Sequence, residues 1–401
     1  VVCFAISRCL FCLWVFVSSF AAGLAAKGIQ VSDFPFCGNG GASSIVMDVS
    51  ATVKPRVFLR DKPRRVLIDM PEVQWQVGRS IEPKGIIAGF RHGLFSSGTY
   101  RIVLDLKKPA VVSKAFPLPA REGYSDRYVI DLKSTGSAAF TKAVKVSRAA
   151  RMKVLKPTVS VAPPKIVRRT DNKRIIVIDA GHGGVDPGTL GRFGANEKIL
   201  TLKISREIKR ELEKTGRYKV YLTRNKDIYV PHRSRFALAK RVGADLFVSV
   251  HVDAIKNSKV RGGTVYTLNE RASDKEAARL ARKENKSDVL AGVDLAYTND
   301  EVSSILIDLA QRETMNASAQ FAEILLPEMR KQVRMHKKGH RFANLLVLKS
   351  PDVPSILLET GYQTNKADAR MLNSRKGQRS ISKALRIAAD KYFETLVVQG
   401  R

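Results

Sequence analysis

Hydrophobic and polar positions follow two different periods along the chain, and the change of period divides it. Between about residues 45 and 133, short β-branched runs such as PRVFLRD, RRVLIDM and RYVIDLK are separated by Gly, Pro and Ser, which is typical of strands. From residue 173 onward, apolar runs such as IIVID alternate with amphipathic segments, and the first of these places four apolar residues at helical spacing: Leu200, Ile204, Ile208 and Leu212. The pattern predicts a small all-β domain followed by an α/β domain with a mainly parallel sheet flanked by helices.

Three strand-like segments of the first domain share one form. They are Arg65-Val-Leu-Ile-Asp69, Arg101-Ile-Val-Leu-Asp105 and Arg127-Tyr-Val-Ile-Asp131. Their similarity suggests paired strands in a domain spanning about residues 44–133, although chance similarity among strands remains an alternative for three copies at unequal spacing. Residues 27–44 show no periodicity and are expected to form an irregular lead-in.

A basic segment at residues 134–172 separates the two domains. Between Ser134 and Arg174 there are eleven lysines and arginines and one acid, Asp171, together with the Pro-containing run KPTVSVAPPK. We expect most of this linker to be extended. It either holds an anionic polymer electrostatically or acts as a solvated spacer.

Composition and charge indicate where the folded chain is expected to act. The sequence has 401 residues, 44% of them apolar, and a formal net charge of +33, which suits a folded protein in a polyanionic environment. Three of the four cysteines, Cys3, Cys9 and Cys12, lie in an apolar N-terminal run that ends in small residues. This run predicts a cleaved signal peptide at residues 1–26 and export from the cytoplasm. The alternative is a membrane anchor, but the apolar stretch is shorter than the about 20 residues that a span requires.

Four polar side chains stand at the predicted carboxyl edge of the α/β sheet. His182 follows the strand IIVID, His251 and Glu359 close later strands, and Glu197 begins the first helix. Ligands of open α/β sheets bind at this edge. Two imidazoles and a carboxylate can hold zinc with one position left for water, and a further carboxylate can move protons there. Each histidine taken alone is more simply explained as a hydrogen-bonded structural residue.

The order of these motifs resembles one enzyme family. The stretches DAGHGGVDPG (179–188), SVHVDA (249–254) and VLKSPDVPSILLETG (347–361) are similar to those of zinc-dependent N-acetylmuramoyl-L-alanine amidases, over essentially the whole region 173–401. The resemblance implies that His182, Glu197 and His251 hold Zn²⁺ and that Glu359 is the catalytic carboxylate. It implies hydrolysis of the amide between the lactyl group of N-acetylmuramic acid and L-alanine in peptidoglycan. Residues 44–133 resemble the AMIN domain, which implies targeting to peptidoglycan, and the family resemblance implies the periplasm as the destination of the exported protein.

A helical insertion at about residues 270–335 is larger than a sheet crossover requires. Within it, Glu284 shares an apolar face with Ala277, Leu280 and Ala281 at helical spacing, so this carboxylate is expected to point toward the protein body. The resemblance to division-associated members of the family implies a helix here that covers the zinc with a glutamate until an activator with a LytM-type domain displaces it. Glu284 is the candidate inhibitory fourth ligand and Glu276 the next. The alternative is a partly solvated Glu284 beside Lys283 or Lys286.

Three functions are consistent with these features. The first is an exported zinc amidase that splits septal peptidoglycan, with peptidoglycan and a LytM-domain activator as partners. The second is a catalytically inactive peptidoglycan-binding scaffold, which the presence of all four polar groups disfavours. The third is a zinc peptidase that cuts within the stem peptide. No nucleic-acid motif accompanies the positive charge, and no membrane span is expected after signal cleavage.

Overall fold

The computed structural model describes residues 28–78, 81–154, 173–191, 194, 196–293 and 305–398. The predicted signal peptide lies outside these ranges, as do the second half of the basic linker and the middle of the helical insertion. No helix within the described ranges has both the length and the apolar character needed to cross a membrane.

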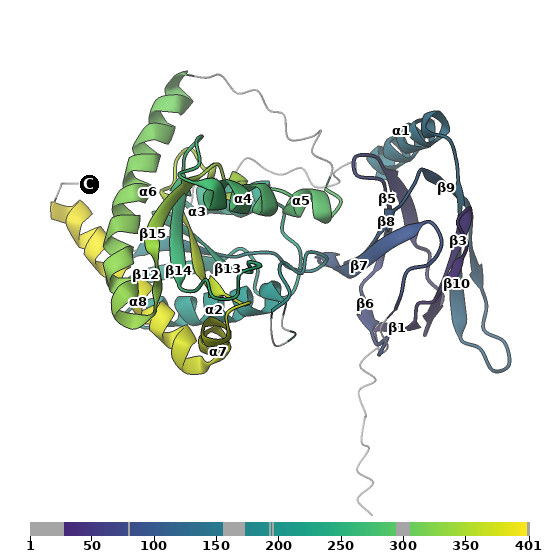
Figure 1. Cartoon of the computed structure of the whole chain (residues 1–401), viewed down its shortest axis with the longest axis horizontal. Coiled ribbons are helices and arrows are strands. Elements are labelled where there is room, and N and C mark those ends of the chain that lie inside the picture. Colours follow the sequence, from purple (N-terminus) through teal and green to yellow (C-terminus); the bar gives the residue numbers. More distant parts are fainter. Residues whose placement is uncertain are drawn as a thin grey trace, which may run out of the picture.

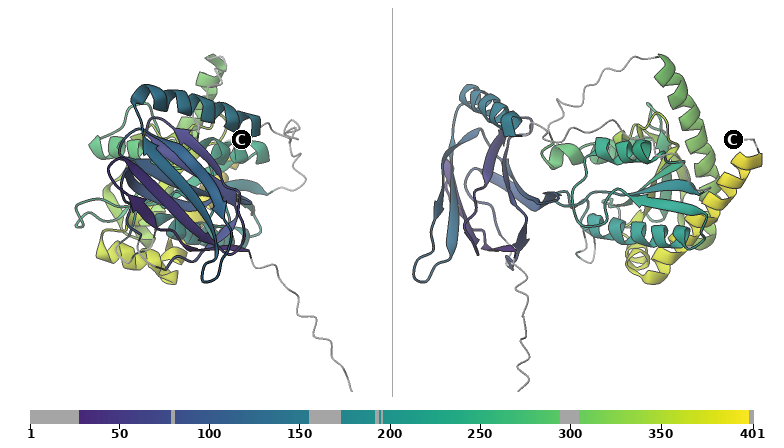
Figure 2. Two further views of the ribbon diagram at one scale, coloured as in Figure 1. Left: turned by 90° about the vertical axis from the view of Figure 1, so that its right-hand side faces the viewer. Right: turned by 180° about the vertical axis from the view of Figure 1, so that it is seen from behind.

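The N-terminal domain is a sandwich of two sheets (Figures 1 and 2). The first has the strand order β6-β1-β3-β10-β9, with β2 also paired to β3, and the second has the order β4-β5-β8-β7. The first sheet consists of β1 (Ile29–Asp33), β2 (Phe36–Gly38), β3 (Ala42–Val49), β6 (Val73–Trp75), β9 (Ala110–Leu118) and β10 (Asp126–Ser134). The second consists of β4 (Arg56–Arg60), β5 (Arg65–Pro71), β7 (Ile87–Ser96) and β8 (Thr99–Leu106). Buried side chains from both sheets, such as Ile45 and Ile68, form one core.

The repeated Arg–Asp segments have a structural role in the second sheet. β5 and β8 are antiparallel, and their register sets Arg65 opposite Asp105 and Asp69 opposite Arg101. Each opposed pair forms an ion pair, at 2.5 Å in both cases. The third copy lies in β10 of the other sheet, so two of the three similar segments pair directly with each other.

One expectation about this half of the chain is wrong, and another is modified. The lead-in is not irregular, because β1, β2 and the start of β3 lie within residues 29–44 and bury alternate side chains such as Val31 and Phe36. The linker, expected to be mostly extended, contains helix α1 (Ser137–Val154) in its first half, which packs against β4, and its second half lies outside the described residues. The first half contains no proline and is rich in Ala, Lys and Arg, which are good helix formers.

The C-terminal domain is built on a six-stranded sheet of order β12-β11-β13-β16-β14-β15. Four strands, β12, β11, β13 and β16, are parallel, whereas β14 runs antiparallel to β16 and parallel to β15. The mainly parallel sheet predicted from the sequence is therefore confirmed. The strands are β11 (Arg174–Ala180), β12 (Tyr218–Leu222), β13 (Leu246–Asp253), β14 (Gly263–Leu268), β15 (Met335–Ala343) and β16 (Ser355–Tyr362).

Helices cover both faces of this sheet (Figure 1). Ile176 and Ile178 of β11 face a core shared with α2, α6 and α8, while Ile175 and Val177 face a core shared with α3 and α4. Because neighbouring residues of a strand point to opposite faces, the continuous apolar run of β11 fills both cores. The helices are α2 (Glu197–Glu213), α3 (His232–Val242), α4 (Lys275–Glu284), α5 (Ser287–Leu290), α6 (Ile305–Gln332), α7 (Lys366–Asn373) and α8 (Arg375–Val398), with a 3₁₀ turn η2 (Leu346–Leu348).

Candidate metal centre

The four polar residues singled out at the sheet edge come together in the structure. His251 of β13 and Glu359 of β16 are directly opposed in the parallel register of the two strands. His182 lies two residues after β11 and has a positive φ of 60°, while Glu197 is the first residue of α2. All four side chains are buried. The carboxyl edge of the sheet therefore carries two imidazoles and two carboxylates in one place.

Glu284, the last residue of α4, completes a set of four converging donor atoms. His182 Nε2 lies 3.2 Å from Glu197 Oε1 and 3.3 Å from Glu284 Oε2. His251 Nδ1 lies 3.3 Å and 3.2 Å from the same two oxygens. Donors bound tetrahedrally to zinc at about 2.0 Å would be separated by about 3.3 Å. The four histidine–glutamate separations therefore match those expected between the ligands of a zinc site.

The inward histidine nitrogens are suited to a metal for a second reason. Both are buried and neither forms a hydrogen bond with any described residue. The other ring nitrogen of His182, Nδ1, lies 2.9 Å from Asp186 Oδ2. A proton on Nδ1 leaves the Nε2 lone pair free, an arrangement that orients metal-binding histidines in proteins. Burial lowers the pKa of His182, but Glu197, Asp186 and Glu284 outweigh this effect and raise that pKa, so the site attracts positive charge. The donor set therefore fits a zinc ion.

Glu359 is buried beside the donor set without a hydrogen-bond partner among the described residues. Atoms of His251, Glu284 and Glu359 lie within 4.8 Å of one another. Burial, followed by the charges of Asp253 and Glu197, raises the pKa of Glu359 well above its ordinary value. A carboxyl group that holds its proton readily can exchange it with a reacting group nearby.

The insertion closes this site in the structure. Glu284 is 2% exposed, and its Oε1 is paired with Lys283 Nζ at 2.9 Å. Lys283 itself also contacts Asp253 at 2.9 Å. The cavity at the donor set measures about 10 Å³, the room of about one water molecule. Glu284 is therefore buried rather than partly solvated, and it is also paired with Lys283. Glu276 instead pairs with Arg279.

Further contacts hold the insertion over the site. Ser287 of α5 donates a hydrogen bond to Asp186. Asp288 accepts hydrogen bonds from the hydroxyl of Tyr229 and, at 3.0 Å, from the backbone N–H of His232. The ring Nε2 of His232 lies 3.0 Å from the carbonyl oxygen of Glu284. Glu284 is thus held in the donor set by contacts of its side chain, of its backbone carbonyl and of the turn that follows it.

Sequence reasoning missed several residues around the site. Asp186 lies four positions after His182 within the DAGHGGVDPG stretch, and this spacing of a carboxylate and an imidazole is a signal that could have found it. Arg235 donates to the carbonyl oxygen of His182 at 2.9 Å and is paired with buried Asp179 at 2.8 Å. No sequence pattern links Arg235 to this loop, because the two meet only through the fold.

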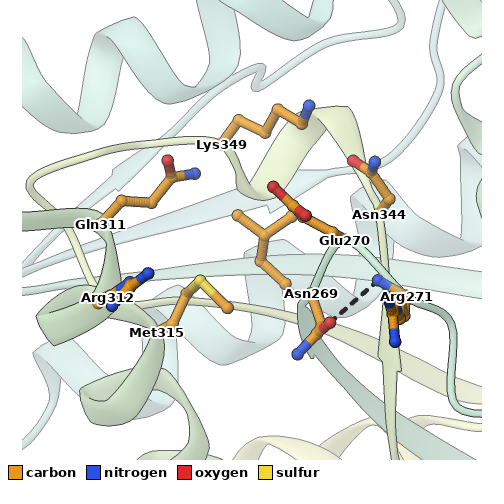
Figure 3. Close-up of a pocket in the computed structure, with 9 residues that line it drawn as sticks. Asn269, Glu270, Arg271, Gln311, Arg312, Met315, Asn344 and Lys349 are labelled. Carbon is orange, nitrogen blue, oxygen red and sulfur yellow. Dashed lines mark hydrogen bonds between the residues drawn. The ribbon is translucent and has the colours of Figure 1, made fainter. Parts of the chain in front are cut away.

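A larger hollow of about 740 Å³ lies elsewhere on the C-terminal domain (Figure 3). It is lined by the end of β14 and the residues after it, by residues of α6 and by residues on either side of η2, namely Leu268, Asn269, Glu270, Arg271, Gln311, Arg312, Met315, Asn344 and Lys349. None of these residues belongs to the donor set. The size of a hollow is therefore a poor guide to the chemistry of this domain.

Comparisons with known proteins agree with the two-domain division. The family described as N-acetylmuramoyl-L-alanine amidase matches residues 176–390, and the AMIN domain matches residues 36–132. The chain is 31% identical to N-acetylmuramoyl-L-alanine amidase AmiC of Neisseria meningitidis, over 88% of each chain. It is 30% identical to a protein of the same name from Escherichia coli, over 87% of this chain and 86% of that one. Among solved structures, AmiC2 of Nostoc punctiforme is 27% identical, with 55% of this chain and 97% of that chain covered and a TM-score of 0.42.

Proposed function

Because the chain belongs to the N-acetylmuramoyl-L-alanine amidase family, we propose that it cleaves peptidoglycan with a zinc ion held by His182, Glu197 and His251. The bond cut is the amide between the lactyl group of N-acetylmuramic acid and the L-alanine of the stem peptide. The observation that carries the metal proposal is the approach of His182 Nε2 and His251 Nδ1 to the same oxygen, Glu197 Oε1, at 3.2 and 3.3 Å, with ligand atoms of the three residues all within 4.8 Å of one another. The choice of this amide rests on the family.

The residues of the site have distinct parts in this reaction. When bound, zinc would lower the pKa of a water molecule and polarise the substrate carbonyl. Glu359 takes a proton from the attacking water and returns it to the alanine nitrogen as the carbon–nitrogen bond breaks. Asp186 holds the Nδ1 proton of His182 and so keeps its Nε2 lone pair directed inward. The products are a free lactyl carboxylate and a free peptide amine, and no covalent bond to the protein forms.

We further propose that the described state is self-inhibited. Glu284 Oε2 occupies the fourth donor position, which the reaction requires for water. The small cavity at the donor set supports this proposal, because a glycan strand with its stem peptide cannot enter about 10 Å³. Withdrawal of α4 removes Glu284 and its neighbour Lys283 together. A protein with a LytM-type domain is the proposed agent of that withdrawal.

The relatives and the N-terminal domain also bear on the compartment in which the protein acts. The relatives and the AMIN domain indicate an extracytoplasmic protein. We propose that residues 1–26 are a cleaved signal peptide, that the protein acts in the periplasm, and that it splits septal peptidoglycan. The net charge of +33 favours association with an anionic cell wall.

One experiment tests the amidase against its alternatives. Purified peptidoglycan is digested with the mature protein and its activator, with and without a zinc chelator, and the soluble products are identified by mass. Muropeptides split into free glycan and intact stem peptides support the proposal, and chelation should abolish them. Cuts within the stem peptide would identify a peptidase. Undigested peptidoglycan that still binds the protein would identify a scaffold.

A further inference from the structure

The N-terminal β domain contacts the C-terminal domain through the end of β7, which reaches toward it in Figures 1 and 2. Leu94 forms a parallel bridge with Ile228 and accepts a hydrogen bond from Tyr229 N at 3.0 Å. Phe95 stacks on the ring of Tyr229 with centroids 6.0 Å apart. This β-domain strand therefore pairs with the loop whose Tyr229 also holds Asp288 of the insertion.

Glycines permit this close approach. A Cβ on Gly93 would lie 2.5 Å from backbone atoms of Gly184, and a Cβ on Gly184 would lie 1.8 Å from the carbonyl oxygen of Leu94. On the insertion side, a Cβ on Gly292 would lie 2.7 Å from the side chain of Leu67 of β5. At Gly93 and Gly184 the close neighbours are backbone atoms, so the two surfaces fit together only without side chains there, whereas at Gly292 the Leu67 side chain would have to move.

Four arginines of the second β sheet bind the backbone of the insertion. Their targets are consecutive or nearly consecutive carbonyl oxygens at the end of α5 and just beyond it. Arg65 donates to Val289 and Arg60 to Val293, while Arg91 and Arg101 donate at 3.0 Å to Leu290 and Ala291. Carbonyl oxygens at the end of a helical turn carry partial negative charge, so guanidinium groups are well suited to bind them. The carbonyl of Val289 also accepts a hydrogen bond from the backbone N–H of Gly292 at 3.1 Å.

Aspartates of the same sheet hold these arginines in place. Asp69 accepts from Arg101 Nε and Nη2 at 2.5 and 2.7 Å, which leaves Nη1 for the insertion. Asp105 likewise binds both Arg65 and Arg91. The repeated Arg–Asp segments thus present a pre-oriented row of donors, and Arg101 is only 1% exposed in the closed arrangement.

The carbonyls bound by the arginines lie close to the inhibitory residue in the sequence. Val289 is five residues after Glu284, and the turn between them is tied by backbone bonds such as Leu290 N to Lys286 O at 2.8 Å. Ser287 and Asp288, in the same turn, are bonded to the C-terminal domain. The segment is thus held by the arginines of the β domain and by the bonds of Ser287 and Asp288. While both groups of contacts persist, α4 and α5 cannot move as a unit and Glu284 cannot leave the donor set.

We propose that the β domain is a docking surface for the inhibitory segment of its own chain, and that Arg60, Arg65, Arg91 and Arg101 hold Glu284 in the closed position. This inference rests on the proposed inhibition by Glu284. The β domain would then regulate the enzyme in addition to its expected targeting role, because its separation from α5 and the release of Glu284 from the donor set would occur together. Any partner that pulls the β domain away from α5 weakens the closed state.

The test uses the full-length protein with two substitutions, Arg60→Gln and Arg91→Gln. These arginines are chosen because Arg65 and Arg101 are buried against aspartates and their loss endangers the β sandwich, whereas Asp105 keeps Arg65 as partner when Arg91 is replaced. Arg121→Gln, on an exposed turn of the same domain, is the matched control. Thermal unfolding of all variants verifies that the fold is kept.

Two readouts are expected to change together. Amide hydrogen exchange across residues 285–293, measured without metal, should accelerate by about tenfold in the double variant and remain unchanged in Arg121→Gln. Activator-free release of dye-labelled peptidoglycan should rise by a similar factor. In a Glu284→Ala background, the two arginine substitutions should add no further release, because the residue that they hold in place is gone.

The outcomes separate this inference from the proposed function. Unchanged exchange in the double variant overturns the docking proposal, whatever Glu284→Ala does. Faster exchange with unchanged release, in a protein that Glu284→Ala activates, also overturns it, because the docked segment then does not control the site. If Glu284→Ala fails to raise release, the inhibition proposal fails, while the exchange result still reports whether the arginines hold the segment.

Discussion

Replacement of Glu284 by alanine should convert the closed protein into a constitutively active one. The alanine variant loses the approach of Oε2 to the two histidine nitrogens, which exists only in the closed state; the pair with the neighbouring Lys283 belongs to α4 itself and moves with it. A charge-assisted contact of a buried carboxylate contributes about 1.5–3 kcal/mol, and each 1.4 kcal/mol changes an equilibrium about tenfold. The closed population should therefore fall by about 10- to 100-fold relative to the open one.

The assay is release of dye from labelled peptidoglycan in the absence of any activator. We expect release by Glu284→Ala to exceed that of the unmodified protein by about 10- to 100-fold, with Glu284→Gln between the two, because the amide keeps the volume but not the charge. Glu323→Ala, at an exposed position of α6, should behave like the unmodified protein. Equal release by Glu284→Ala and the unmodified protein, at equal zinc content, would refute the reasoning.

Three more predictions concern the metal, the proton and the β sheet. Asp186→Asn should weaken zinc binding by about 10- to 100-fold, measured by competition with a chromophoric chelator, and unchanged affinity would contradict the role of the 2.9 Å contact with His182. Glu359→Gln and His251→Ala should both abolish peptidoglycan release, but only His251→Ala should lose stoichiometric zinc by elemental analysis; zinc loss in Glu359→Gln would place that residue among the ligands instead. Burial raises the pKa of Asp105, but Arg91 and Arg65 outweigh it and lower that pKa. The ionised carboxylate should therefore stabilise the fold above its ordinary pKa of 3.8 and lose this effect as the pH falls below it. Urea midpoints of Asp105→Asn and the unmodified protein should differ at pH 7, and the difference should shrink as the pH falls below 3.8 toward the lowered pKa of Asp105; a constant difference would count against this ion-pair network.

Regular periodicity made most of the architecture predictable from the sequence. The apolar run of β11 and the helical spacing in α2 were sufficient to place His182 and Glu197 at one edge of a mainly parallel sheet. Short or glycine-containing strands were not predictable in the same way. β1 and β2 have too few residues for a period to emerge, and β7 is interrupted by Gly89 and Gly93, which weaken a strand pattern.

The site was less predictable than the fold, because many of its contacts join segments that are far apart in the sequence. Helical spacing placed Glu284 on the inward face of the insertion, but the pattern carried no information about which groups it would meet. Lys283 also reaches the site, although it lies outside the apolar stripe, because its long side chain turns back to Asp253. The binding of α5 by arginines of the β domain could not be foreseen either, since it joins residues about 200 positions apart.

His251 and Glu359 are neighbours on adjacent strands of the sheet, so hydrogen bonding between the strands sets the spacing of the proposed zinc ligand and the proposed catalytic carboxylate. Glu284, the proposed inhibitor, lies on the separate helix α4, whose withdrawal leaves the hydrogen bonds between these strands in place. On this proposal, the sheet sets the geometry of the reacting groups and the insertion controls access to them. A lineage that shortened or deleted the insertion should therefore keep a competent hydrolase and lose only its inhibition.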